Sequence, residues 1–249
     1  MGSTVAIVTG ASGGIGRAVA ERFGALGYDV VVHYGGGAER AAEVVEAVRA
    51  AGGRAIAVRA DVADETEVAA LFAQAEAEFG GVDVVVHTAG IMPLAPIAEM
   101  DLADFDRVQR VNVRGTFVVD QAAARTVRAG GAIVNFSTSV TRLQQPGYGA
   151  YAASKGAVES LTLILARELR GRDVTVNAVA PGPRGAARRA RRGHRAAPDR
   201  RRRGRDLRAG GPGGPGEQGD PLQVVAHPRG ARGRGLLRPR RIRSALRRL

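Results

Sequence analysis

The chain has 249 residues, no cysteine, four scattered histidines and a formal net charge of +13. This composition excludes disulfides and thiolate metal sites, and no apolar run is long enough to cross a bilayer. The charge is uneven, because residues 1–183 carry a net −4 and residues 184–249 a net +17. We expect a cytoplasmic protein, since a strand begins directly after the N-terminus and leaves no room for a signal peptide.

Short β-branched runs alternate with longer helical segments through residues 1–183. Segments such as 38–52 and 65–80 place apolar residues at helical spacing and end in glycine. This alternation predicts an α/β fold, a doubly wound parallel sheet of the Rossmann type, in a single domain. The six predicted strands are Val5–Val8, Val30–His33, Ala55–Val58, Val82–His87, Ala132–Phe136 and Val174–Val179.

The first predicted strand runs into the segment TGASGGIG, Thr9 to Gly16. Its glycines allow a tight turn and a close backbone approach to a pyrophosphate, and the helix that opens near Ile15 offers its free amides to that anion. The segment therefore predicts a nucleotide-binding turn. Its expected cofactor contacts are Gly10, Ser12, Gly13, Gly14, Ile15 and Gly16.

The end of the second predicted strand bears on the choice of cofactor. NAD sites usually place a carboxylate there, which binds the ribose 2′-hydroxyl. Here Tyr34 and Gly35 occupy that place, and Arg40 follows a glycine-rich turn. A neutral turn followed by a cation favours a 2′-phosphate, so we expect NADP(H).

The segment YAASK contains Lys155, the only lysine of the chain, one helical turn after Tyr151. A free tyrosine has a pKa of about 10 and transfers protons poorly at neutral pH. A lysine one turn away on the same helix face would lower that pKa and make Tyr151 a usable acid. The spacing also occurs by chance on solvated helix faces, but here it follows a strand whose exit, FSTSV, carries three hydroxyls.

Taken together, these motifs resemble the short-chain dehydrogenase/reductase family. The matching pieces are TGASGGIG, ADV at 60–62, HTAG at 87–90, Asn112 in VNVRGTF, NFSTS, YAASK and VNAVAPG, in the family's order and spacing. The likeness is greatest to 3-oxoacyl-acyl-carrier-protein reductases and polyhydroxynaphthalene-reductase-like members. It implies NADP(H)-dependent reduction of a small-molecule carbonyl, a 3-oxoacyl thioester or similar ketone, by a homotetramer or dimer without a nucleic-acid or membrane partner.

The resemblance also implies a role for each matching residue. Tyr151 is the expected proton donor, Lys155 lowers its pKa and holds the nicotinamide ribose, and Asn112 anchors a water in the proton relay. The hydroxyl that orients the substrate is Thr138 by ungapped counting, or Ser139 after a shift of one residue. The remaining expected cofactor contacts are Tyr34, Asp61, Val62, Ala89, Gly90, Tyr151, Lys155, Pro181 and Gly182.

Two departures from the family pattern occur in this part of the chain. His87 and Thr88 stand where the family usually has two asparagines, which puts one strand-bracing hydrogen bond in doubt. We interpret His87 as a packed or capping residue and not as a catalytic one. Thr138 replaces the usual serine and keeps the hydroxyl.

Residues 184–249 do not match the family and are rich in arginine, glycine and proline. Such a composition cannot bury enough apolar surface to fold, so we expect disorder, no strand, and an exposed edge on Val174–Val179. Three interpretations compete: a disordered interaction tail, a basic tail that binds nucleic acid on a catalytically dead relic, and an out-of-frame translation of a GC-rich gene. We favour the last, which leaves residues 1–183 as an incomplete catalytic domain.

Overall fold

Seven strands and seven α-helices make up the part of the chain that the structure, a computed structural model, describes: residues 3–182 and 222–225. The strands are β1 (Val5–Thr9), β2 (Asp29–Tyr34), β3 (Ala55–Arg59), β4 (Val82–His87), β5 (Val127–Phe136), β6 (Thr175–Pro181) and β7 (Leu222–Val225). The α-helices are α1 (Gly14–Gly24), α2 (Ala38–Ala50), α3 (Glu65–Phe79), α4 (Leu102–Val108), α5 (Gly115–Thr126), α6 (Val140–Leu143) and α7 (Gly149–Glu168). A 3-10 helix η1 (Ile97–Glu99) and a π-helix η2 (Gln109–Arg114) complete the set.

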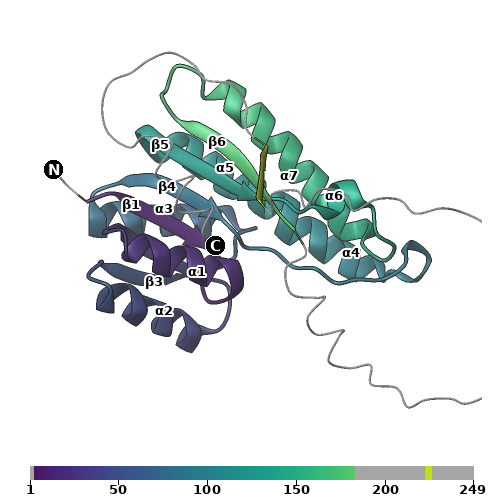
Figure 1. The fold of residues 1–249 in the computed structure, drawn as a ribbon, viewed down its shortest axis with the longest axis horizontal. Coiled ribbons are helices and arrows are strands. Elements are labelled where there is room, and N and C mark those ends of the chain that lie inside the picture. The colour runs from purple at the N-terminus through teal and green to yellow at the C-terminus, as the bar shows by residue number, and fades with distance from the viewer. Residues whose placement is uncertain (1–2, 183–221, 226–249) are drawn as a thin grey trace, which may run out of the picture.

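The strands form one sheet in the order β3-β2-β1-β4-β5-β6-β7 (Figure 1). Strands β1 to β6 pair in parallel, which confirms the predicted doubly wound fold. The chain order reverses between β1 and β4, and ligands of such sheets bind where the strands end on either side of this reversal. The glycine-rich turn follows β1, and the HTAG segment begins with the last residue of β4.

The two faces of the sheet are covered by different helices, because successive strand residues point to opposite sides. Val30 and Val32 pack in one core cluster with residues of α1 and α2, such as Phe23. Val31 packs in a second cluster with residues of α3, α5 and α7, such as Leu71. The alternating valines of the strands thus supply both cores at once.

Local sequence signals explain where the helices begin and end. In α3, the side chain of Asp64 accepts hydrogen bonds from the backbone amides of Thr66 and Glu67, which would otherwise lack partners. The helix ends at Gly80, whose φ of 82° is a left-handed conformation that glycine adopts without strain. This helix connects β3 to β4 and packs on the sheet through buried residues such as Leu71.

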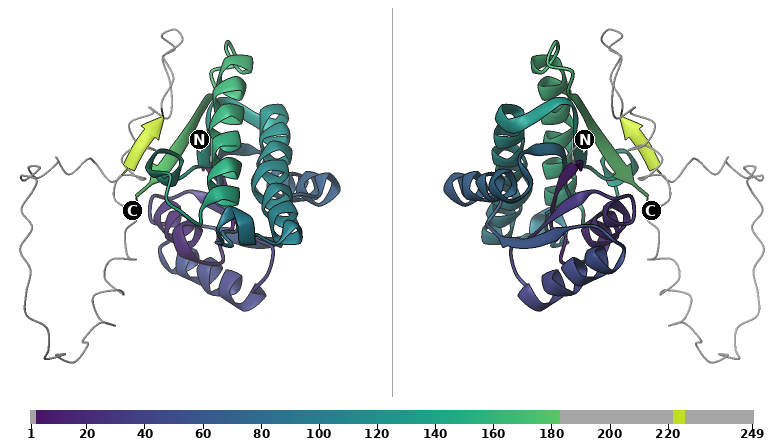
Figure 2. Two further views of the ribbon diagram at one scale, coloured as in Figure 1. Left: turned by 90° about the vertical axis from the view of Figure 1, so that its right-hand side faces the viewer. Right: turned by 90° about the vertical axis from the view of Figure 1, so that its left-hand side faces the viewer.

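The C-terminal segment differs from our expectation in one respect. Strand β7 pairs antiparallel with β6, from Ala178 opposite Val225 to Pro181 opposite Leu222, and Figure 2 shows the two side by side. The predictions of no strand in this segment and of an exposed β6 edge were therefore wrong. The unpaired backbone groups of β6 provide the reason, because an open strand edge binds even a short extended segment. The predicted disorder and frame shift concern residues that otherwise lie outside those described.

Candidate active site

The turn between β1 and α1 is shaped by close backbone packing. Gly10 has a φ of 67°, and a Cβ there would lie 2.9 Å from Cα of Ala89. A Cβ on Gly16 would lie 2.5 Å from Oγ1 of Thr88. A Cβ on Gly13, by contrast, would meet no atom within 4 Å. Gly10 and Gly16 therefore fit the turn against the loop after β4, while open space remains in front of Gly13.

A second loop, directly after β4, is tied to the end of β1 by Thr9. Its buried hydroxyl oxygen accepts hydrogen bonds from the amides of Thr88 (3.1 Å) and Ala89 (3.2 Å). The hydroxyl of Thr88 in turn donates to the carbonyl oxygen of Thr9. Ala89 and Gly90, two predicted cofactor contacts, thus lie beside the glycine-rich turn.

Asn112 braces this same loop from the helical side. Its amide oxygen accepts from the Ile91 amide at 2.8 Å, and its Nδ2 donates to the Ile91 carbonyl at 2.9 Å and to the Ser154 hydroxyl at 3.0 Å. Asn112 is fully buried and lies in η2, and such π-turns often occur at functional sites. The Asn112 side chain thus joins the loop after β4 to α7. That it also anchors a water of the proton relay stays a prediction.

Tyr151 and Thr138 meet where β5 ends and α7 begins. The two side chains are hydrogen-bonded, and this bond lowers the pKa of Tyr151, but burial has the larger effect and raises that pKa above its usual 10.0. Ser139 instead initiates α6, and its amide donates to the Pro181 carbonyl oxygen at 3.1 Å. The geometry therefore places Thr138, and not Ser139, against the phenol.

Lys155 is buried beside this pair, one turn further along α7. Its ammonium donates to the carbonyl oxygen of Phe136 at 2.7 Å and lies 5.8 Å from the centroid of the Tyr151 ring. Burial lowers the pKa of Lys155 to about 8. In this structure burial dominates the pKa of Tyr151 and raises it, and the ammonium of Lys155 is bonded to Phe136, so the lowering of that pKa by Lys155 stays a prediction.

The other predicted cofactor contacts lie at the same edge of the sheet. Tyr34 ends β2 and is partly buried, and Asp61 and Val62 follow β3. The Asp61 carboxylate forms an ion pair with Arg110 of η2 at 2.7 Å. Pro181 ends β6, and Gly182 follows it as the last residue described before the gap.

Sequence reasoning missed a buried polar group beneath the site, on the face covered by α5 and α7. Asp120 of α5 accepts from Nδ2 of Asn135 at 2.9 Å, and the same nitrogen donates to the hydroxyl of Thr162 at 3.0 Å. Burial raises the pKa of Asp120 to about 7. Oδ1 of both Asp120 and Asn135 lacks a hydrogen-bond partner among the described residues. An acidic residue at an otherwise apolar position of α5 was the only available signal.

Two buried histidines lie at the same edge of the sheet, and only His87 was interpreted from the sequence, as a packed or capping residue. His87 is 2% exposed, and burial together with the charge of Lys155 lowers its pKa to about 3. It is therefore neutral and packed, as we interpreted it from the sequence. His33 is 1% exposed, and burial likewise lowers its pKa. Both rings contact the start of the glycine-rich turn.

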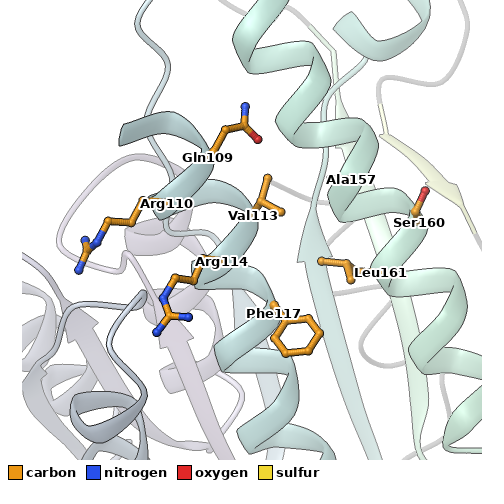
Figure 3. A pocket seen from close by; sticks show the side chains of 8 residues that line it. All are labelled: Gln109, Arg110, Val113, Arg114, Phe117, Ala157, Ser160 and Leu161. Carbon is orange, nitrogen blue, oxygen red and sulfur yellow. The ribbon is translucent and has the colours of Figure 1, made fainter. Parts of the chain in front are cut away.

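A cavity of about 620 Å³ lies elsewhere, between η2, α5 and α7. Figure 3 shows Val113, Phe117 and Leu161 facing the space between the helices, while Arg110 and Arg114 point away from α7. Its lining residues are Gln109, Arg110, Val113, Arg114, Phe117, Ala157, Ser160 and Leu161. None of these is a predicted site residue, so this cavity is separate from the site around Tyr151.

Within residues 3–182 and 222–225, no group of three or more acidic or histidine side chains could hold a metal ion. In the same residues, no helix combines the length and the apolar character that crossing a membrane requires.

The geometry agrees with three comparisons to known proteins. A family model described as short chain dehydrogenase matches residues 4–195. A short-chain type dehydrogenase/reductase of Picea abies is 45% identical over 193 residues, which is 74% of this chain and 71% of the relative. The 3-oxoacyl-acyl-carrier-protein reductase FabG of Staphylococcus aureus strain MW2 is 42% identical, over 71% of this chain and 73% of the relative. The crystal structure of a short chain dehydrogenase from Burkholderia cenocepacia J2315 in complex with NADP aligns with a TM-score of 0.71 at 40% identity, over 77% of this chain and 82% of that chain.

Proposed function

The chain belongs to the short-chain dehydrogenase family of oxidoreductases, and on that premise we propose that it reduces a ketone to an alcohol with NADPH. The observation that carries this proposal is the contact between Tyr151 and Thr138 beside the buried Lys155. It unites a proton donor, a second hydroxyl and a cation at the carboxyl ends of the strands. Such a group of side chains suits proton transfer to a carbonyl oxygen.

The residues of the nucleotide turn fit NADP(H). Open space lies before Gly13 and Gly14, where a Cβ would meet no atom, and the N-terminus of α1 faces this space with its free amides. In the turn after β2, the guanidinium of Arg40 packs against Gly37. A Cβ added to Gly37 would lie 2.7 Å from Cζ of Arg40. A cation on a turn without a carboxylate suits a 2′-phosphate. NADP in the Burkholderia relative supports the same choice.

When bound, the nicotinamide cofactor supplies the hydride that reduces the carbonyl carbon. The protein supplies the proton and the orientation. Tyr151 is protonated at neutral pH and can donate a hydrogen bond to the carbonyl oxygen, but its raised pKa requires a nearby cation to stabilise the phenolate as the proton leaves. The Thr138 hydroxyl adjoins the phenol and can hold the same oxygen in place. These roles are assigned to Thr138 and Tyr151 together.

Lys155 is assigned two tasks. With a pKa of about 8, it is largely charged at neutral pH, so it favours the phenolate that forms when Tyr151 gives up its proton. A hypothetical Cβ on Gly90 would lie 3.6 Å from its ammonium, so Lys155 borders the predicted cofactor path. There its remaining protons can bind a ribose hydroxyl. An arginine could not place a compact ammonium in this position.

The surroundings of Tyr151 favour a substrate with an apolar body. Met92 and Leu94, in the loop after β4, are 51% and 47% exposed. This loop is joined to the segment directly before α7, because the Ala95 amide donates to the Gly147 carbonyl oxygen at 3.1 Å. Leu143 of α6 is 53% exposed. Exposed apolar side chains near a catalytic group often contact an apolar ligand. We therefore propose a 3-oxoacyl thioester or a similar ketone as substrate.

Cofactor oxidation by the purified full chain tests the proposal. Acetoacetyl thioester and an aromatic ketone serve as substrates, each with NADPH and with NADH. We expect turnover with NADPH and a lower kcat/KM with NADH, because the turn after β2 lacks a carboxylate for the ribose 2′-hydroxyl. Equal or better use of NADH would contradict the cofactor assignment. Absence of any carbonyl reduction by a folded chain would contradict the proposed activity.

A further inference from the structure

Two buried histidines flank the start of the nucleotide-binding turn. The turn leaves β1, and the neighbours of β1 in the sheet are β2 and β4. His33 lies near the end of β2, and His87 ends β4 directly opposite Thr9. Each ring therefore reaches the turn from one side. Neither histidine has a role in the proton transfer proposed above.

His33 binds two consecutive amides of the turn. Its Nδ1 lies 3.1 Å from the Gly10 nitrogen, and its own carbonyl oxygen accepts from the Ala11 amide at 2.9 Å. Its Nε2 lies 2.9 Å from the carbonyl oxygen of Ala60, which follows β3. An amide can only donate and a carbonyl can only accept, so Nδ1 is unprotonated and Nε2 carries the hydrogen. The ring is thus one defined neutral tautomer.

The same reasoning fixes the tautomer of His87. Its Nδ1 lies 2.8 Å from the hydroxyl oxygen of Thr9. That oxygen already accepts from the amides of Thr88 and Ala89, so the hydroxyl hydrogen remains for Nδ1 of His87. His87 therefore orients the hydroxyl that joins the glycine-rich turn to the loop after β4.

We propose that His33 and His87 are positioning residues for the dinucleotide, which hold the turn at Thr9–Ala11 in its binding conformation through unprotonated Nδ1 atoms. The proposal rests on the cofactor binding proposed above, and it gives a role to His33, which no quoted motif contains, and to His87, the first residue of the HTAG segment. A protonated Nδ1 of His33 would oppose the Gly10 amide, donor against donor. The nearby charged groups are Asp61 beside His33 and Lys155 near His87.

Two amide substitutions separate this role from simple core packing. In His33→Asn, the side-chain oxygen can take the place of Nδ1 and accept from Gly10. In His33→Gln, the longer amide reaches the place of Nε2 and leaves the Gly10 amide without its acceptor. Each variant loses one of the two ring contacts, and only His33→Gln loses the side-chain contact to the Gly10 amide, while the backbone bond to Ala11 stays in both. The variants His87→Asn and His87→Gln test the hydrogen bond between His87 and the Thr9 hydroxyl in the same way.

The experiment measures the dissociation constant of NADP⁺ by calorimetry and the hydrogen exchange of the Gly10 amide by NMR, on the full chain. We expect wild type and His33→Asn to bind alike, and His33→Gln to bind about tenfold more weakly with faster exchange at Gly10. At His87, we expect the Gln variant to bind more weakly than the Asn variant. Thermal unfolding of each variant shows whether it is folded.

Ring nitrogen chemical shifts of the wild-type protein give a second measurement that requires no cofactor and no variant. We expect both histidines to show an unprotonated Nδ1 and a protonated Nε2. A protonated Nδ1 in His33, or equal NADP⁺ affinity of its folded Asn and Gln variants, would overturn the proposal. Wild-type protein that shows the expected tautomers but binds no NADP⁺ would instead overturn the proposed cofactor and the histidines' role in holding it.

Discussion

The nucleotide side of the site, at the ends of β1, β2 and β3, differs from the catalytic side, at the end of β5 and along α7. On the nucleotide side, both ring nitrogens of His33 have partners and the amides of Gly10 and Ala11 are bonded to it. On the catalytic side, burial displaces the pKa values of Tyr151 and Lys155 from their usual ranges. On the nucleotide side burial also lowers the pKa values of His33 and His87, and it thereby keeps both rings neutral and able to accept hydrogen bonds. On the catalytic side it acts on the two groups assigned to proton transfer.

The largest expected effect is a loss of kcat, from a substitution that changes only the catalytic side. Replacing Tyr151 by phenylalanine removes the proton donor, and we expect kcat to fall by about 10³-fold, within the range for general acids. The dissociation constant of NADPH should change little, because the nucleotide side is intact. Steady-state kinetics and cofactor titration measure the two quantities.

Tyr148→Phe is the matched control for this change. Tyr148 directly precedes α7, and its replacement removes the same hydroxyl three residues from Tyr151. Tyr148 acts on Tyr151 only through charge, by raising its pKa, whereas Thr138 is hydrogen-bonded to Tyr151. We expect this variant to keep most of its kcat. A Tyr151→Phe variant as active as Tyr148→Phe would refute the assignment of the donor.

A pair of glycine substitutions tests the nucleotide side in the same manner. A Cβ on Gly16 would press on Thr88 and on the carbonyl of Gly10, so we expect Gly16→Ala to lower the free energy of unfolding by about 1–3 kcal/mol. Gly13→Ala meets no atom and should change stability by less than about 1 kcal/mol. Its methyl group would instead enter the space assigned to the cofactor phosphates.

Chemical denaturation and NADP⁺ titration measure both members of the pair. We expect Gly13→Ala to weaken NADP⁺ binding by about tenfold while it stays folded. If Gly13→Ala bound NADP⁺ as tightly as wild type, the phosphates would not lie where the turn places them.

A smaller effect concerns the stability of the catalytic side and not its chemistry, and it depends on Asp120 of α5. Burial raises the pKa of Asp120 to about 7, well above its usual 3.8, so the folded protein holds this proton more firmly than the unfolded chain. The resulting stability is present below about pH 4 and is lost as the pH rises to about 7. At pH 8, the folded protein therefore contains a buried, poorly solvated carboxylate.

We expect Asp120→Asn to raise the free energy of unfolding by about 1–2 kcal/mol at about pH 8, and by less at about pH 5. The new amide can also donate to Oδ1 of Asn135, which lacks a partner among the described residues. Denaturation at the two pH values measures the difference. A variant less stable than wild type at the higher pH would show that the carboxylate has a stabilising partner.

Much of the fold could be predicted because it depends on local patterns. β-branched runs gave β4 its observed bounds, and the glycines of the first turn marked the nucleotide side. β5 begins at Val127 instead of Ala132, because Val127 pairs with Val82 across an irregularity in the register. β7 was missed because a four-residue strand exists only through pairing with β6.

The chemistry of the site was predicted less completely, since it depends on burial and on contacts distant in sequence. The Tyr151 and Lys155 spacing identified the residues, but only the fold shows that the lysine bonds to Phe136. The roles of His33 and Asp120 depend on neighbours from other strands and helices. No motif could show these contacts.

The pH dependence of kcat/KM for NADPH-driven ketone reduction tests the central claim most directly. The account requires Tyr151 to carry its proton and Lys155 to be charged, and the pKa of Lys155 is about 8. We predict that kcat/KM falls as the pH rises through about 8 to 9, and that Lys155→Ala removes this dependence along with most of the activity. A kcat/KM that stays constant or rises from about pH 7 to about pH 10 would contradict the account.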